Sequence, residues 1–179
     1  MDGSPTGSSG SPVWWWLMGG GLALAVALVA MVVAVAPWND DPAASRQAEV
    51  EARGAEVMPF DQEQTVHRFA PTPTGGTETV TVRDGAARNQ VGLIRAHLGH
   101  EQMLFSTGDF SDPMAIHGHA MPGVASLAEA ATGGRLTVTY ASVPGGARLV
   151  YRADTRAVVD AVHAWFDAQL RDHAAHATT

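Results

Sequence analysis

The sequence of 179 residues contains no cysteine and no lysine. Without cysteine, the chain has no disulfide bond, thiolate metal site, iron–sulfur ligand or cysteine nucleophile. Its 11 basic residues are all arginines, and 18 acidic residues outnumber them, for a formal net charge of −7. Because a nucleic-acid backbone is bound by a basic surface, this balance predicts no nucleic-acid partner.

The sequence also lacks the short motifs of common enzyme classes. It has no G-x-S-x-G, no P-loop, no G-x-G-x-x-G after a predicted strand and no H-E-x-x-H. No serine has a spacing that implies an activated nucleophile. We therefore expect a binding or interaction domain rather than an enzyme, with its polar chemistry carried by eight histidines, the acids and the arginines.

One long apolar run is present, at residues 13–36. About 24 uncharged residues exceed the ~20 that cross a bilayer, and tryptophans at both ends suit the headgroup level. The run predicts a single-pass transmembrane helix, with the lipid bilayer and possible membrane proteins as partners. A cleaved signal peptide is the alternative, since Ala34-Val35-Ala36 resembles a cleavage site. The short polar N-terminal tail favours a soluble domain on the extracytoplasmic side of the cell membrane. The alternative is a cytoplasmic domain, which the positive charges of Arg46 and Arg53 after the run favour.

Composition divides the rest of the chain. Residues 1–12 are rich in Gly, Ser and Pro and are expected to be a disordered tail. Residues 37–56 are expected to be a stalk or linker, helical or flexible, and their Ala, Glu and Arg content favours a helix. Residues 57–172 are expected to form one soluble domain of ordinary size, followed by a flexible tail at 173–179.

The predicted domain contains a repeated pattern. Two alternating segments flank a Gly-Gly pair at residues 66–82, and a similar arrangement recurs at residues 136–151; an amphipathic helix follows each. This pattern predicts an α+β fold of two ββα units, with a four-stranded antiparallel sheet and its helices on one face. Chance similarity is the alternative, because Gly-Gly turns are common in glycine-rich chains.

Two groups of histidines stand out as candidate ligands. His97 and His163 lie on the apolar faces of the two predicted helices at matching places, so related packing of the two units would bring them together. His117, His119 and Met121 alternate, and in an extended segment all three would face one way. Imidazole and thioether donors suit copper among the metals. The predicted metal ligands are His67, His97, His117, His119, Met121 and His163; the alternative is that each histidine is a hydrogen-bonded structural residue.

Four segments together resemble a known group of proteins: VMPFDQEQTVHRF, IRAHL, GDFSDPMAIHGHAMPGV and AVHAWFDAQLRDH. They are similar to small uncharacterised actinobacterial-type proteins with a membrane-anchored or exported domain, and the resemblance covers about residues 57–173. The matching text includes His67, His97, His117, Met121 and His163. Some members are labelled aspartate carbamoyltransferase, but that enzyme needs two α/β domains and a Ser-Thr-Arg-Thr phosphate loop, and this sequence has neither. The resemblance implies a cell-envelope setting and no catalytic mechanism.

Taken together, these features predict a membrane-anchored protein whose soluble domain binds copper, another transition metal or haem. The alternative is an assembly module of the cell envelope in which the histidines are structural. The two hypotheses differ in one geometric respect: a metal site needs three or more donors that converge at bond lengths of ~2.0–2.3 Å. The histidines also predict pH-dependent behaviour, because their usual pKa is ~6.5.

Overall fold

The computed structural model describes residues 41–173 and 176–179. The predicted disordered tail, at 1–12, and the predicted transmembrane helix, at 13–36, lie outside these residues. In the part of the chain that is described, no helix is both long and apolar enough to cross a membrane. Residues Asp41–Thr179 form one compact unit.

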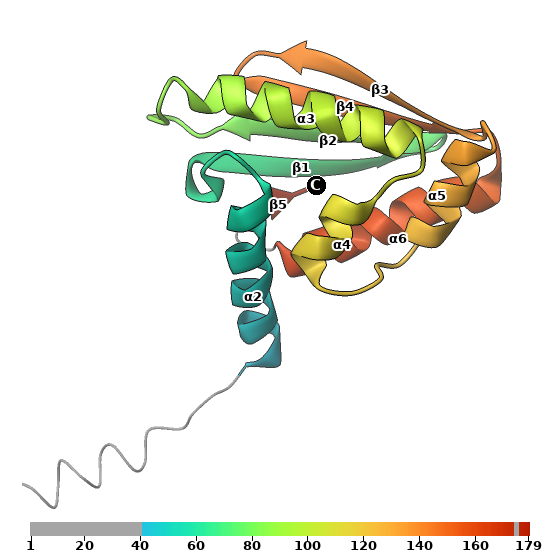
Figure 1. Ribbon diagram of the computed structural model, residues 1–179, viewed down its shortest axis with the longest axis horizontal. Helices are drawn as coiled ribbons and strands as arrows, with labels where there is room; N and C mark the ends of the chain where they lie inside the picture. The colour runs from blue at the N-terminus through green and yellow to red at the C-terminus, as the bar shows by residue number, and fades with distance from the viewer. Residues whose placement is uncertain (1–40, 174–175) are drawn as a thin grey trace, which may run out of the picture. The chain divides into compact units, whose positions relative to one another are not determined.

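The centre of the unit is a five-stranded mixed sheet in the order β3-β4-β2-β1-β5 (Figure 1). Its strands are β1 (Thr65–Thr72), β2 (Gly75–Val82), β3 (Leu136–Val143), β4 (Gly146–Ala153) and β5 (Ala177–Thr178). The α+β class is confirmed, but the predicted four-stranded antiparallel sheet is wrong. The last segment of the chain returns along β1 and pairs with it in parallel, and His67 N donates to His176 O at 2.8 Å. These backbone hydrogen bonds hold residues predicted to be a flexible tail.

Two hairpins of equal length meet in the middle of the sheet. Each has a two-residue connection, between the paired residues Thr72 and Gly75 in one and Val143 and Gly146 in the other. Strands β2 and β4 then pair with each other. A side chain at Gly146 would place its Cβ 1.9 Å from Val80 O, so this close pairing of the central strands requires glycine there.

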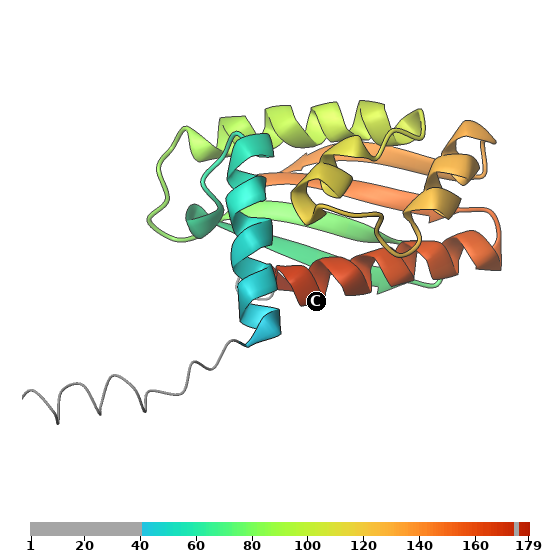
Figure 2. The same ribbon diagram turned by 60° about the horizontal axis from the view of Figure 1, so that its bottom comes forward.

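The helices pack on one face of the sheet. They are α2 (Pro42–Val57), α3 (Gln90–Ser106), α4 (Ser111–His117), α5 (Val124–Thr132) and α6 (Arg156–Asp172), with a short 3-10 turn, η2 (Gln62–Gln64). Figure 2 shows α3 and α6 along opposite sides of this face, with α4 and α5 in front of the sheet between them. The long amphipathic helices α3 and α6 thus bury their apolar faces against the strands.

Helix α2 belongs to the compact unit, which therefore begins before residue 57, the predicted domain boundary. Its Val50 is fully buried. The Arg53 side chain donates from Nε to Ile116 O at 2.7 Å and so joins α2 to α4. Residues 42–56, predicted to be a stalk or linker, are therefore a packed helix.

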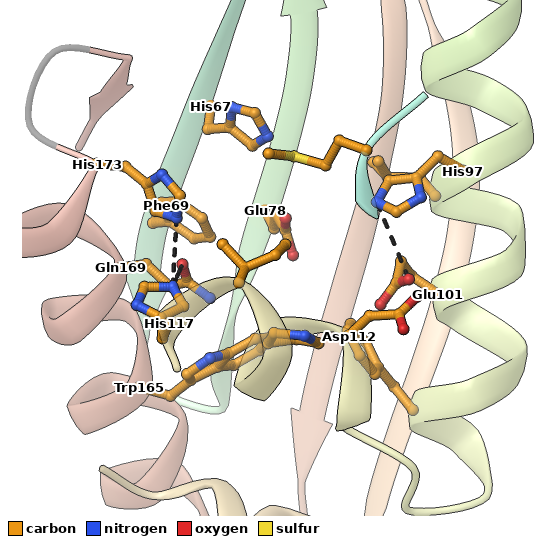
Figure 3. A pocket seen from close by; sticks show the side chains of 15 residues that line it. His67, Phe69, Glu78, His97, Glu101, Asp112, His117, Trp165, Gln169 and His173 are labelled. Atoms are coloured by element: carbon orange, nitrogen blue, oxygen red, sulfur yellow. Dashed lines mark hydrogen bonds and ion pairs between the residues drawn. The ribbon is translucent and has the colours of Figure 1, made fainter. Parts of the chain in front are cut away.

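An aromatic cluster fills the space between α3, α6 and the sheet. Phe105 stacks on Phe110 with 4.5 Å between ring centroids, and Trp165 meets both rings edge-on at 5.7 Å. Tyr151 of β4 contacts Trp165 from the sheet side. Such edge-on pairs are favourable beyond the area that they bury. They fix Trp165, whose other side borders the cavity described next (Figure 3).

Candidate functional site

A cavity of about 50 Å³, lined by both polar and apolar side chains, lies between the sheet and the helices α3, α4 and α6 (Figure 3). Four imidazoles line it, those of His67, His97, His117 and His173. The volume holds roughly three or four water molecules. Pockets for drug-sized ligands measure ~300–1,000 Å³, so a haem does not fit this cavity.

Regular spacing within the elements places these side chains. Trp165, Gln169 and His173 follow one another at intervals of four at the end of α6, so they share one side of the helix. On β1, His67 and Phe69 alternate with outward residues and both line the cavity. Strand β1 and helix α6, far apart in the sequence, therefore meet around one small space.

His117 is held by an ionised carboxylate. Its Nδ1 lies 2.7 Å from Asp172 Oδ2, and Arg46 donates to the same carboxylate at 2.6 and 3.0 Å. Partial burial raises the pKa of Asp172, but the hydrogen bonds from Arg46 and His117 outweigh it and bring the pKa to about 2. Burial lowers the pKa of His117, while the hydrogen bonds with Asp172 and Gln169 act in the opposite direction. In the neutral ring whose Nδ1–H group donates to Asp172, Nε2 carries the lone pair.

Two further polar atoms lie close to Nε2 of His117. His117 Nε2 lies 3.0 Å from Gln169 Oε1 and 3.3 Å from His173 Nε2. Burial, followed by the nearby His117, lowers the pKa of His173 to about 4, so this imidazole is also neutral at pH 7. Two nitrogens bound to one metal at ~2.05 Å with a tetrahedral angle lie roughly 3.3 Å apart. The spacing of the two imidazole nitrogens therefore matches that of two ligands of one metal ion.

The opposite wall carries two acids whose pKa values are raised. Burial, with a smaller contribution from a hydrogen bond with Asp112, raises the pKa of Glu101 to about 9. His97 lies 3.9 Å from Glu101, too far for a hydrogen bond, and burial lowers the pKa of this histidine to about 4. Burial also raises the pKa of Glu78 to about 7, although Tyr151 donates to it at 2.8 Å. This wall thus presents a protonated carboxyl group beside a neutral imidazole at pH 7.

Three buried polar atoms of lining residues make no hydrogen bond within the described part of the chain. They are His67 Nδ1, Glu101 Oε1 and Trp165 Nε1. Burial lowers the pKa of His67 to about 3, so its ring is neutral. A buried polar atom without a partner costs ~1–3 kcal/mol. Three such atoms around one cavity favour a space that receives a polar ligand.

Half of the predicted metal ligands line this cavity: His67, His97 and His117. The structure adds His173 and Gln169, and Met58, which the sequence offers as a further thioether donor, is the one methionine among the residues that line the cavity. The intervals of four residues from Trp165 to Gln169 and from Gln169 to His173 are the pattern in the sequence that places these side chains together. From residue 173 onward, the sequence instead predicted a flexible tail.

The other predicted ligands lie elsewhere. His163 Nε2 contacts the carbonyl oxygens of Thr72 and Gly75 at 3.0 and 2.9 Å and holds the first hairpin turn. His119 is exposed, and Met121 is buried in the hydrophobic core.

The expected extended geometry of His117, His119 and Met121 is not adopted. His117 is the last residue of α4, and Gly118 ends that helix with a φ of 70°. The chain therefore turns between His117 and His119, and the three side chains point in different directions.

Comparisons of the chain with models of protein families, with curated proteins and with solved structures find no match. The resemblance to actinobacterial-type envelope domains therefore stays a prediction. So does the duplication of a ββα unit.

Proposed function

We propose that the domain binds one transition metal ion of the copper type in the cavity, through His117 Nε2 and His173 Nε2. The observation that carries this proposal is the 3.3 Å separation of these two neutral imidazole nitrogens. Gln169 Oε1, 3.0 Å from His117 Nε2, supplies a third and weaker donor. Copper is preferred because imidazole and amide donors are joined on the cavity wall by the thioether of Met58.

The hydrogen bond behind His117 supports the same proposal. A metal-binding imidazole usually donates its other N–H group to a carboxylate, which fixes the ring and makes it a better ligand. Asp172 fills this role at 2.7 Å, and Arg46 holds Asp172 in turn.

We also propose that residues 13–36 anchor this domain in the cell membrane and leave it on the extracytoplasmic side. The support is the sequence itself, with its uncharged run and flanking tryptophans. An oxidising compartment suits a chain that binds metal with histidine and methionine and has no cysteine. Digestion of intact cells by an added protease removes the domain if the orientation is correct and spares it if the domain is cytoplasmic.

Metal titration of the purified full-length chain tests the cavity. We expect His117→Ala and His173→Ala each to lower the affinity for Cu(II) at least about tenfold in calorimetry. Electron paramagnetic resonance of the Cu(II) complex should show coupling to two imidazole nitrogens. His100→Ala is the matched control, because this exposed histidine of α3 does not line the cavity, and it should leave affinity unchanged. Equal affinity in wild type and both cavity variants would overturn the proposal.

Substitution of Gln169 distinguishes a metal site from a purely structural hydrogen-bond network. Gln169→Glu keeps an oxygen donor but removes the N–H groups with which a turned amide would donate to His117. If Gln169 is a ligand, the variant binds copper at least as tightly as wild type. If its role is to donate to His117, the variant loses stability without metal. Absence of copper binding in wild type, with such a loss, would favour an assembly module with structural histidines.

A further inference from the structure

A second cluster of ligand atoms lies outside the cavity, where three separate parts of the chain meet. His176 Nε2 is 3.6 Å from Glu63 Oε1 and 3.9 Å from Glu51 Oε1. Within residues 41–173 and 176–179, this is the one group of three histidine or acidic residues whose ligand atoms all lie within 4.8 Å of one another. Glu51 belongs to α2, Glu63 to η2, and His176 to the segment that leads into β5.

The histidine of this cluster is buried and lacks hydrogen bonds. Only 9% of its side chain is exposed, and Nδ1 has no partner among the described residues. Nε2 points at the two carboxylates but is farther from both than a hydrogen bond reaches. A buried imidazole without partners is costly, and here it faces two groups of negative charge. A cation between the three side chains would bind Nε2, which has no hydrogen bond to either carboxylate, and would offset the repulsion between the carboxylates.

We infer that Glu51, Glu63 and His176 form a second cation site, for a divalent ion of the zinc type. One imidazole and two carboxylates are a ligand set that zinc takes, with water in the fourth position. Ligands of tetrahedral zinc lie roughly 3.3 Å apart, so the 3.6 and 3.9 Å separations need only a small contraction. The side chains of Glu51 and Glu63 are 47% and 72% exposed and are therefore able to turn toward the ion.

The ion would fasten the C-terminal segment to the helical side of the domain. His176 O accepts from His67 N, and Ala177 N donates to His173 O, so this segment contacts β1 and the end of α6. A metal that joins residues 51, 63 and 176 closes a long loop and stabilises the folded chain. The inference does not depend on copper binding in the cavity, because the two sites share no ligand.

The test is zinc binding by the full-length chain in a background that removes the two imidazoles of the proposed copper site, His117→Ala/His173→Ala. We expect this background to bind one equivalent of Zn(II) from ZnCl₂ in calorimetry and to gain thermal stability from it. Adding Glu51→Gln/Glu63→Gln should lower the zinc affinity at least about tenfold and abolish the rise in Tm. Both replaced side chains are exposed, so the apo fold is expected to persist, as its circular dichroism spectrum will show.

A matched control removes the same charge from the same part of the chain. Glu49→Gln/Glu56→Gln changes two exposed acids of α2 that lie outside the cluster and should leave zinc affinity unchanged. Equal loss in both double variants would show a general charge effect and would overturn the inference, as would equal zinc affinity with and without Glu51 and Glu63. Copper binding lost only in the His117 and His173 variants would support the cavity site and leave the zinc result to decide this one.

Discussion

Replacement of the buried acid Glu78 by glutamine should stabilise the protein, but only above about pH 5. Burial raises the pKa of Glu78 from its usual 4.5 to about 7, while the hydrogen bond from Tyr151 acts in the opposite direction. The unfolded chain therefore releases this proton at a lower pH than the folded chain does. The raised pKa contributes stability that is complete below about pH 4.5 and is lost as the pH rises through about 7.

The size of the effect follows from the shift. A rise from 4.5 to about 7 corresponds to ~3 kcal/mol of free energy of unfolding at pH 8, at ~1.36 kcal/mol per pKa unit. Glu78 is partly buried by accessible surface, so solvent screening reduces the figure to about 2 kcal/mol. Glu78→Gln has nearly the same shape, and its amide oxygen still accepts from Tyr151. The variant should match wild type at pH 4.5 and exceed it by about 2 kcal/mol at pH 8.

Urea denaturation of both proteins at pH 4.5, 6, 7 and 8, followed by circular dichroism, measures this difference. Glu101, whose pKa is also raised, is present in both proteins and so largely cancels. Glu56→Gln, at an exposed position of α2, is the control and should show no such trend. A Glu78→Gln difference that is independent of pH, or one that is destabilising at pH 8, would refute the reasoning.

Two further changes test the site and the sheet. Asp172→Asn removes the negative charge that contacts both Arg46 and His117. It should lower the free energy of unfolding of the metal-free chain at pH 7 by about 1–2 kcal/mol, after allowance for solvent screening at the partly exposed Arg46. It should also weaken copper binding about 10- to 100-fold in calorimetry. Unchanged stability and affinity would show that the carboxylate does not support His117. Gly146→Ala places a Cβ against Val80 O and should destabilise by about 1–3 kcal/mol in thermal denaturation, whereas Gly99→Ala, in open space on α3, should stabilise by about 0.5–1 kcal/mol. Similar effects of the two alanines would contradict the close approach of β2 and β4.

The sequence predicted the α+β class because most of the sheet and the two long helices carry a clear period. Strands β3 and β4 alternate, and α6 repeats its apolar residues every three or four positions. Strand β5 has two residues, too few for any period to appear. Helix α2 buries only Val50 and Gly54, so its composition resembled that of a solvated stalk.

The site was partly predictable for the same kind of reason. His97 lies on the inner face of a helix with a regular pattern, and its place was read from that pattern. The alternation of His117, His119 and Met121 predicted an extended segment. His117 instead ends α4, a helix of seven residues, which is too short to show a helical period of apolar residues. His163 and Gln169 both lie on α6, but the His163 side chain contacts the first hairpin and not the cavity. Which side of a helix meets a cavity depends on long-range packing, and local spacing does not supply it.

The pairing of β2 with β4 has a consequence for how the chain folds. Its paired residues, from Thr81 with Gly146 to Gly75 with Arg152, are 65 to 77 positions apart in the sequence, whereas each hairpin closes through two residues. Hairpins form in about 1–10 μs, but a contact across so long a loop must first overcome the entropy of closing it. The two halves of the sheet therefore acquire local structure early, and their joining limits the rate of folding. The cavity is completed only after this step, because its walls come from both halves.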